Sequence, residues 1–157
     1  MKTRELQTLW WDWLSTSERL LRSLHEQTVA LTLRDVARVE RIQPELETLQ
    51  ERMRQIDDRA ATCARTLAEE MNTEMSLRGL VQVLEKAEAQ QVQSIANRVT
   101  VAARNVQGVI AKNRSLIDSE MTYINGTLTL IAKAAADNKG PFKATSEHAA
   151  VLVDEAA

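Results

Sequence analysis

The hydrophobic positions at the start of the chain recur alternately three and four residues apart. This spacing places apolar side chains on one stripe of an α-helix, and it predicts a first helix over about residues 3–33. Because the average repeat of about 3.5 residues is shorter than one helical turn, helices in contact along such stripes wind around each other. The stripe consists of Leu6, Trp10, Trp13, Ser17, Leu20, Leu24, Gln27 and Leu31, and only the serine and the glutamine interrupt it.

A second stripe with the same spacing predicts a helix over about residues 35–71. Asp35 directly precedes it and is a residue type that caps helix N-termini. Pro44 lies inside the segment, where it lacks a backbone donor and clashes with the preceding turn. Two alternatives stay open: the helix bends at Pro44, or residues 35–43 form a separate turn and Pro44 begins the main helix. The stripe consists of Val39, Ile42, Leu46, Leu49, Met53, Ile56, Ala60, Cys63 and Leu67.

The remaining pattern predicts a loop near Asn72, a short helix over about residues 77–88 capped by Ser76, and a last helix over about 89–137. The sequence does not fix the break between these two helices. A single helix over residues 90–136 would be about 70 Å long and would need partners along most of its length. We expect one helical bundle over residues 1–137 and a mobile C-terminal tail of the same domain over residues 138–157.

The C-terminal half of the last helix carries more apolar positions than a contact with one other helix requires. Its main stripe consists of Val92, Ile95, Val99, Ala102, Val106, Ile110, Ile117, Met121, Ile124, Leu128 and Ile131. A second row, with a spacing of seven residues, consists of Val109, Leu116, Tyr123 and Leu130. Either this half lies in the middle of a three- or four-helix bundle, or the second row is partly open for a partner.

The composition supports an all-α fold of long antiparallel helices in a coiled-coil-like bundle. Aromatic residues make up 3% of the chain, with only 4 glycines and 2 prolines, a mixture that favours helices over sheets. The 20 basic and 22 acidic residues give a net charge of −2, so the chain has no overall field that would attract nucleic acid. No segment is apolar enough for a membrane span and the N-terminus does not read as a signal peptide, so we expect a cytoplasmic protein.

The sequence offers no pattern for a metal centre or a catalytic site. Di-metal sites in helical bundles need a carboxylate three residues before a histidine, whereas His25 follows Arg22 and His148 follows Thr145 at that spacing. Cys63 falls on the apolar stripe and is expected to be a small buried hydrophobic residue. We therefore expect no cofactor, no metal ion and no enzymatic activity.

All three tryptophans lie within four residues, at positions 10, 11 and 13. The spacing predicts that Trp10 and Trp13 pack in the stripe while Trp11 lies over its edge. Contact of this cluster with a membrane surface is the alternative, and Asp12 argues against it.

With these stripes identified, the chain resembles the FlgN family of flagellar export chaperones, the type III secretion chaperones for hook-associated proteins. The resemblance extends from Leu6 to about Phe142. Its first element is the hinge between the first two helices, with Ala30-Leu31, Asp35, Val39, Ile42 and Leu46. Its second element is the segment Asn113-Arg114-Ser115-Leu116-Ile117, followed by Tyr123 and Leu128.

The resemblance implies a protein that binds the amphipathic C-terminal helices of hook-associated proteins, prevents their premature assembly and delivers them to the export gate. It also implies a monomer or weak dimer. Family members carry a Tyr-Gly pair after the last long helix that is associated with gate docking. This chain has Gly140-Pro141-Phe142-Lys143 instead, which leaves Phe142 as the candidate for that role.

The residues predicted to contact the partner combine the second row with the main stripe of the last helix. They are Val109, Asn113, Leu116, Ile117, Met121, Tyr123, Ile124, Leu128, Leu130 and Ile131. A self-associating coiled-coil scaffold or tether is the alternative function, in which a second copy covers the same side chains.

Overall fold

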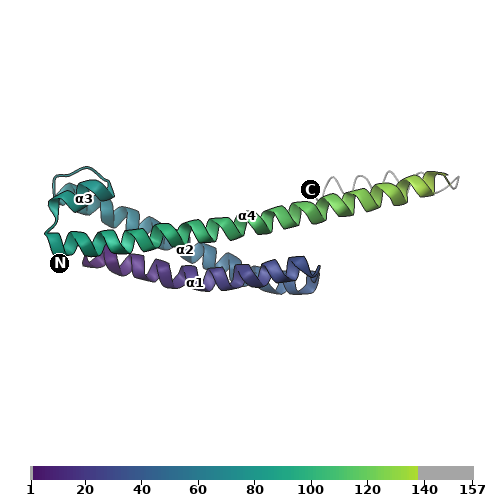
Figure 1. Cartoon of the computed structure of the whole chain (residues 1–157), viewed down its shortest axis with the longest axis horizontal. Helices are drawn as coiled ribbons and strands as arrows, with labels where there is room; N and C mark the ends of the chain where they lie inside the picture. Colours follow the sequence, from purple (N-terminus) through teal and green to yellow (C-terminus); the bar gives the residue numbers. More distant parts are fainter. Residues whose placement is uncertain (1, 138–157) are drawn as a thin grey trace. The chain divides into compact units, whose positions relative to one another are not determined.

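The computed structural model describes residues 2–137, which form four helices and no strand. The helices are α1 (Arg4–Thr32), α2 (Val36–Glu70), α3 (Leu77–Val83) and α4 (Lys86–Asp137) (Figure 1). The prediction of an all-α fold is confirmed. The break before the last helix, which the sequence left open, falls between Val83 and Lys86.

The chain divides into two compact units, Met1–Lys112 and Asn113–Ala157. The expectation of one helical bundle over residues 1–137 with a tail of the same domain stays a prediction. The predicted tail over residues 138–157 lies outside the described residues.

Both predicted N-caps are present. The Asp35 carboxylate accepts a hydrogen bond from the backbone N–H of Arg38 (3.1 Å), and the Ser76 hydroxyl accepts one from Gly79 (2.9 Å). Each cap satisfies a donor that the first turn of the helix leaves without a partner. α2 continues through Pro44 as one helix, so the alternative of a separate turn before it is wrong.

The first two helices end in the same way. After α1, the backbone N–H of Arg34 donates to the carbonyl of Leu31 (3.1 Å) and that of Asp35 to Ala30 (2.9 Å). This pair of bonds is the Schellman motif, which requires a left-handed residue just beyond the helix. Arg34 takes that position at φ 56°, and Asn72 takes it after α2 at φ 55°. These turns reverse the chain, so that α1 and α2 form an antiparallel hairpin (Figure 1).

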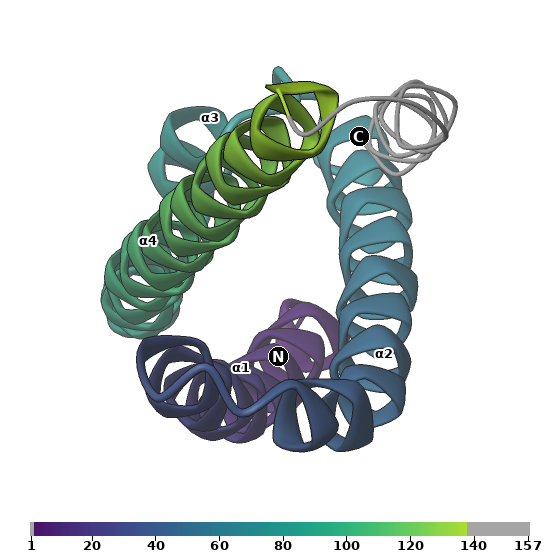
Figure 2. The ribbon, with the colours of Figure 1, turned by 90° about the vertical axis from the view of Figure 1, so that its right-hand side faces the viewer.

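The main core of the first unit lies where α1, α2 and the first part of α4 meet (Figure 2). The predicted stripe of α2 is buried except for Val39 and Cys63, which are half-buried. In α1 the buried face includes Leu9 and Ala30 in place of the predicted Trp10 and Leu31. The core cluster consists of Trp13, Leu20, Leu24, Ala30, Ile42, Leu46, Leu49, Met53, Ile56 and Val106.

A second, smaller cluster joins α3 to the open end of the hairpin. It consists of Leu6, Leu9, Ala60, Leu67, Ala68 and Leu80. Gly79 permits this packing, because a Cβ atom at its position would lie 2.7 Å from the carbonyl oxygen of Glu74. No side chain fits at that distance, so the turn before α3 requires glycine here.

Thr3 and Glu88 join the first residues of α1 and α4. The backbone N–H and the hydroxyl of Thr3 both donate to one carboxylate oxygen of Glu88, at 2.9 and 2.5 Å. The Thr3 hydroxyl also accepts a bond from the Gln7 amide at 2.9 Å. Because these bonds hold the starts of the two helices together, α1 and the first part of α4 run parallel, and α2 runs antiparallel to both.

Candidate protein-binding surface

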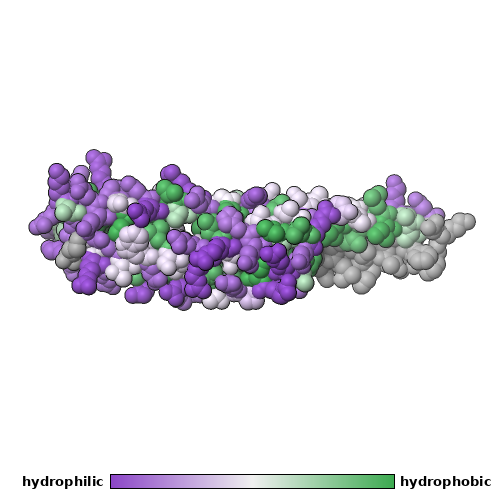
Figure 3. Space-filling view, turned by 60° about the horizontal axis from the view of Figure 1, so that its bottom comes forward, coloured by the Kyte–Doolittle hydropathy of each residue, from purple (hydrophilic) through white to green (hydrophobic). Residues whose placement is uncertain are grey.

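The described part of the second unit, residues 113–137 of α4, exposes large apolar side chains. Tyr123, Leu130 and Ile131 are 57, 69 and 59% exposed, and Ile117 and Ile124 are 40 and 45% exposed. Figure 3 shows apolar side chains gathered on this part of α4. We call the five residues Ile117, Tyr123, Ile124, Leu130 and Ile131 the Ile124 surface.

The Ile124 surface consists of two rows that run along the helix. One row has a spacing of seven residues and consists of Ile117, Ile124 and Ile131. The other consists of Tyr123 and Leu130, which directly precede Ile124 and Ile131 in the sequence. Successive residues differ by about 100° around an α-helix, so the two rows are neighbours on one side. From Ile117 to Ile131 the surface is about 21 Å long at 1.5 Å per residue. That length matches about four turns of a partner helix.

The surface is electrically neutral over most of its length. No charged residue lies between Glu120 and Lys133. Two of the three threonines in this stretch bond their hydroxyl groups within the helix: the hydroxyl of Thr122 donates to the carbonyl of Asp118 (2.9 Å) and that of Thr129 to the carbonyl of Asn125 (2.8 Å). An apolar partner face would therefore meet few groups that lose hydrogen bonds on burial.

Asn125 is a polar residue beside this surface that the sequence pattern did not identify. Its side-chain oxygen Oδ1 is shielded from solvent, and no donor reaches it within the described residues. A buried acceptor without a partner costs about 1–3 kcal/mol. A lone asparagine in a helix gives no sequence signal of this kind.

Two of the predicted contact residues are not part of the exposed surface. Val109 belongs to the first unit and packs, partly buried, against the main core. Asn113 is only 2% exposed. The spacing of seven residues continues through Val109, but helices of the first unit cover that end of the row. Both residues are therefore excluded from the exposed surface.

Leu116, Met121 and Leu128 are half-buried and border the Ile124 surface. Phe142, the predicted gate-docking residue, lies outside the described residues. Eight of the ten predicted contact residues thus lie together on residues 116–131 of α4, five of them exposed and three half-buried.

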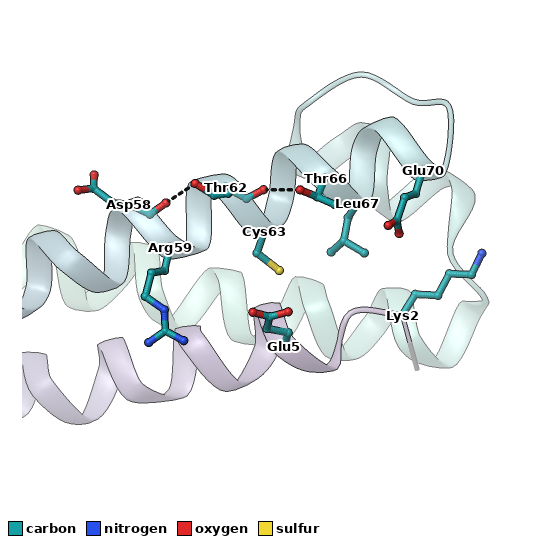
Figure 4. A pocket seen from close by; sticks show the side chains of 9 residues that line it. All are labelled: Lys2, Glu5, Asp58, Arg59, Thr62, Cys63, Thr66, Leu67 and Glu70. Atoms are coloured by element: carbon teal, nitrogen blue, oxygen red, sulfur yellow. Dashed lines mark hydrogen bonds between the residues drawn. The ribbon is translucent and has the colours of Figure 1, made fainter.

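A cavity of about 480 Å³ lies between the N-terminal part of α1 and the C-terminal part of α2 (Figure 4). Its charged lining is mixed, with Lys2 and Arg59 alongside Glu5, Asp58 and Glu70. Cys63 is on its wall and is half-buried, so the prediction of a buried cysteine is wrong. The turn of α2 that carries Cys63 faces the N-terminal end of α1, at the open end of the hairpin.

The Cys63 thiol is a weak nucleophile in this position. Burial raises its pKa, and the negative charges of Glu5 and Glu70 raise it further. A thiol with a raised pKa stays protonated near neutral pH, and the thiolate is the reactive form.

None of the helices in residues 2–137 combines the length and hydrophobicity that a bilayer span requires. Within the same residues, His, Cys, Asp and Glu side chains do not gather in a group of three that could hold a metal ion.

Comparison with known proteins identifies one family. The family described as FlgN protein matches residues 1–140, which is most of the chain. No curated protein and no solved structure gives a match. The long helices, the hairpin between α1 and α2, and the last helix with its apolar rows all fall within the matched residues. The chain belongs to the FlgN family, whose general role is that of flagellar export chaperones.

Proposed function

We propose that this protein is a cytoplasmic chaperone that binds the amphipathic C-terminal helices of hook-associated proteins on the Ile124 surface. Covering these helices prevents their premature assembly and keeps the bound protein ready for delivery to the type III export apparatus. The exposure of the two apolar rows is the observation that carries the proposal. Monomeric soluble proteins rarely leave contiguous apolar patches of this kind uncovered unless they bind something.

The shape and chemistry of the Ile124 surface favour a helical partner. Apolar side chains that repeat every seven residues match the stripe of an amphipathic helix, which places its own apolar residues at the same intervals. The absence of charge over residues 121–132 favours a partner face that is apolar and uncharged.

The expected affinity suits a carrier that must also release its cargo. Full burial of five apolar side chains would contribute on the order of 10 kcal/mol. The loss of translational, rotational and side-chain freedom offsets a large part of this gain. The remainder corresponds to dissociation constants on the order of micromolar to nanomolar.

Delivery to the export gate forms the second step of the proposal. In the family that the chain resembles, a Tyr-Gly pair just after the last long helix is associated with gate docking, and this chain has Phe142 there in place of the tyrosine. Replacement of Phe142 by alanine should then leave binding of the hook-associated helix unchanged while export of the hook-associated protein declines.

The test uses the full chain and a synthetic peptide of the C-terminal helix of a hook-associated protein. In isothermal titration calorimetry, Tyr123→Asp and Leu130→Asp should each weaken peptide binding by at least about tenfold, because an exposed apolar contact becomes a charge that the partner must desolvate. Thr129→Asp is the matched control. Thr129 is exposed and lies about 140° around the helix from Ile124 and about 120° from Tyr123, so this variant should bind normally.

Circular dichroism of the same variants separates binding from folding. The helical signal should stay unchanged, because the substituted side chains are exposed. Unchanged peptide affinity in both variants would contradict the proposal.

The spacing of seven residues also suits a second copy of the chain, which is the structural alternative. In that case Leu130→Asp would convert a tight dimer into a monomer, and the peptide would have no effect on either form. If the protein is a chaperone of hook-associated helices, the peptide binds the wild-type chain and Leu130→Asp removes that binding.

A further inference from the structure

A groove on the first unit lies apart from the Ile124 surface and has a different chemistry. It lies between α1 and α4, has a volume of about 600 Å³, and is lined by Gln7, Trp11, Ala87, Gln90, Gln91, Ser94 and Ile95. We call it the Trp11 groove. Its lining contains no charged residue, and three of its seven residues are glutamines whose amides can both donate and accept hydrogen bonds.

Trp11 and Arg98 form the edge of this groove. Trp11 is 47% exposed, although Trp13 on the same helix is buried in the core. The guanidinium carbon of Arg98 lies 5.5 Å from the centre of the Trp11 ring, a distance at which the cation is attracted to the face of the aromatic ring. Arg98 is one turn beyond Ser94 on α4, so its charge is held at the mouth of the groove.

The charge of Arg98 has no ionic partner within residues 2–137: no carboxylate lies within ion-pair distance of it. α4 carries no acidic residue between Glu88 and Asp118, whereas Arg98, Arg104 and Lys112 lie in that stretch. Glu88 itself accepts the bonds from Thr3. This part of α4 therefore presents positive charge beside an exposed indole ring.

Tryptophan and arginine dominate the binding energy of protein interfaces more often than other residues do. The indole offers a large rigid apolar face, and the guanidinium fork matches the geometry of a carboxylate. Because the ring already holds Arg98 in place, little side-chain freedom is lost when a carboxylate binds.

We propose that the Trp11 groove is a second docking site, and that its occupant is a polypeptide segment with an acidic side chain next to an apolar one. The carboxylate pairs with Arg98 and the apolar side chain covers the exposed part of Trp11. The glutamine amides bond to polar groups of the segment. This site acts independently of the Ile124 surface and does not rest on the chaperone function proposed above.

The test is fluorescence anisotropy with two labelled model peptides added to the full chain. Both are amphipathic helices of about four turns built from leucine and alanine, one with glutamate and the other with lysine at the polar positions. The glutamate peptide should bind the wild-type chain at least about tenfold more tightly than the lysine peptide does. Its affinity should fall with added salt, because exposed charge pairs are screened.

Two variants assign the binding to this groove. Trp11→Ala and Arg98→Gln should each weaken binding of the glutamate peptide by about tenfold. Arg104→Gln is the matched control. It removes the same charge from the same helix, but Arg104 lies about 240° around α4 from Arg98, so the affinity should change by less than about twofold.

Ile124→Asp separates this site from the Ile124 surface. It should leave the difference between the glutamate and lysine peptides intact. Equal binding of the two peptides would overturn the proposal, as would a preference that Ile124→Asp removes and Trp11→Ala preserves. Tryptophan emission gives a second readout: the glutamate peptide should change the spectrum of the wild-type chain but not that of Trp11→Ala.

Discussion

Glu88 stabilises the junction of α1 and α4 through its charge. The hydrogen bonds from the hydroxyl and the backbone N–H of Thr3 lower its pKa below the ordinary value, and the positive charges of the N-terminus and Lys2 lower it slightly further. A carboxyl group with a lowered pKa in the folded state adds stability at pH values above its ordinary pKa. That contribution is lost as the pH falls through the lowered pKa of the folded state.

Replacement of Glu88 by glutamine should therefore lower the thermal midpoint at neutral pH, and the difference should disappear as the pH falls through the lowered pKa of the folded carboxyl. Thermal unfolding followed by circular dichroism across this range measures the difference between the two proteins. Glu85→Gln is the control, because no hydrogen bond or ion pair involves the Glu85 side chain within the described residues. A constant difference at all pH values would contradict the role of the Glu88 charge.

The glycines differ in what surrounds them. A Cβ atom at Gly79 would meet the backbone of Glu74, whereas one at Gly108 or Gly126 would meet nothing within 4 Å. Gly79→Ala should destabilise the protein by about 1–3 kcal/mol through this clash. Gly108→Ala and Gly126→Ala should each stabilise it by about 1 kcal/mol, because alanine favours the helix. Urea unfolding distinguishes these effects, and a stabilising Gly79→Ala would show that the turn before α3 can relax.

In α2 the packing of the helix outweighs the energetic cost of a proline. Pro44 lacks a backbone N–H, so the carbonyl of Glu40 loses its usual helical donor. The flanking residues Ile42 and Leu46 are nonetheless buried in the main core, and the burial of this face keeps the helix continuous. Because Pro44 itself is exposed, Pro44→Ala should add the missing bond without changing the core. We expect a gain in unfolding free energy of about 1–3 kcal/mol, measured by denaturant unfolding, and a loss of stability would show that α2 requires Pro44.

The periodicity of the sequence predicted the helices well. It predicted poorly which of their apolar positions are covered by the rest of the chain. Stripes such as Ile42, Leu46 and Leu49 in α2 identify a buried face, because three- and four-residue spacings arise from helix geometry itself. In α1, however, the same spacing could not choose between Leu9 and Trp10, since neighbouring positions on a 3.6-residue helix both lie near the seam. Whether an apolar row is covered depends on distant parts of the chain. For that reason Val109 and Tyr123 look equivalent in the sequence but differ in exposure.

The sequence likewise predicted only part of the candidate site. The row of Leu116, Tyr123 and Leu130 followed from spacing alone, and the family resemblance gave it a partner. Asn125, by contrast, is distinguished only by the environment of one oxygen atom. The Trp11 groove depends on a contact between side chains 87 positions apart in the chain, Trp11 and Arg98, which no local pattern contains. The tryptophan cluster itself was recognised, and Trp13 is buried while Trp11 lies at the edge, as the spacing predicted.

At the scale of the whole molecule, membership of the FlgN family and the exposed apolar rows point to the same role. The family match covers residues 1–140 and so includes the entire Ile124 surface. Among the described residues about 21 Å of apolar helix is exposed, and a partner or a second copy of the chain would cover it. These two outcomes differ in mass, and mass can be measured directly on the full-length protein.

Sedimentation equilibrium of the full chain, alone and with an excess of a peptide of the C-terminal helix of a hook-associated protein, therefore tests the central claim. We expect a monomer or weak dimer that gains the mass of the bound peptide. The Leu130→Asp variant should gain no mass when the peptide is added. A tight dimer whose mass is unchanged by the peptide would contradict the central claim and would favour a self-associating scaffold.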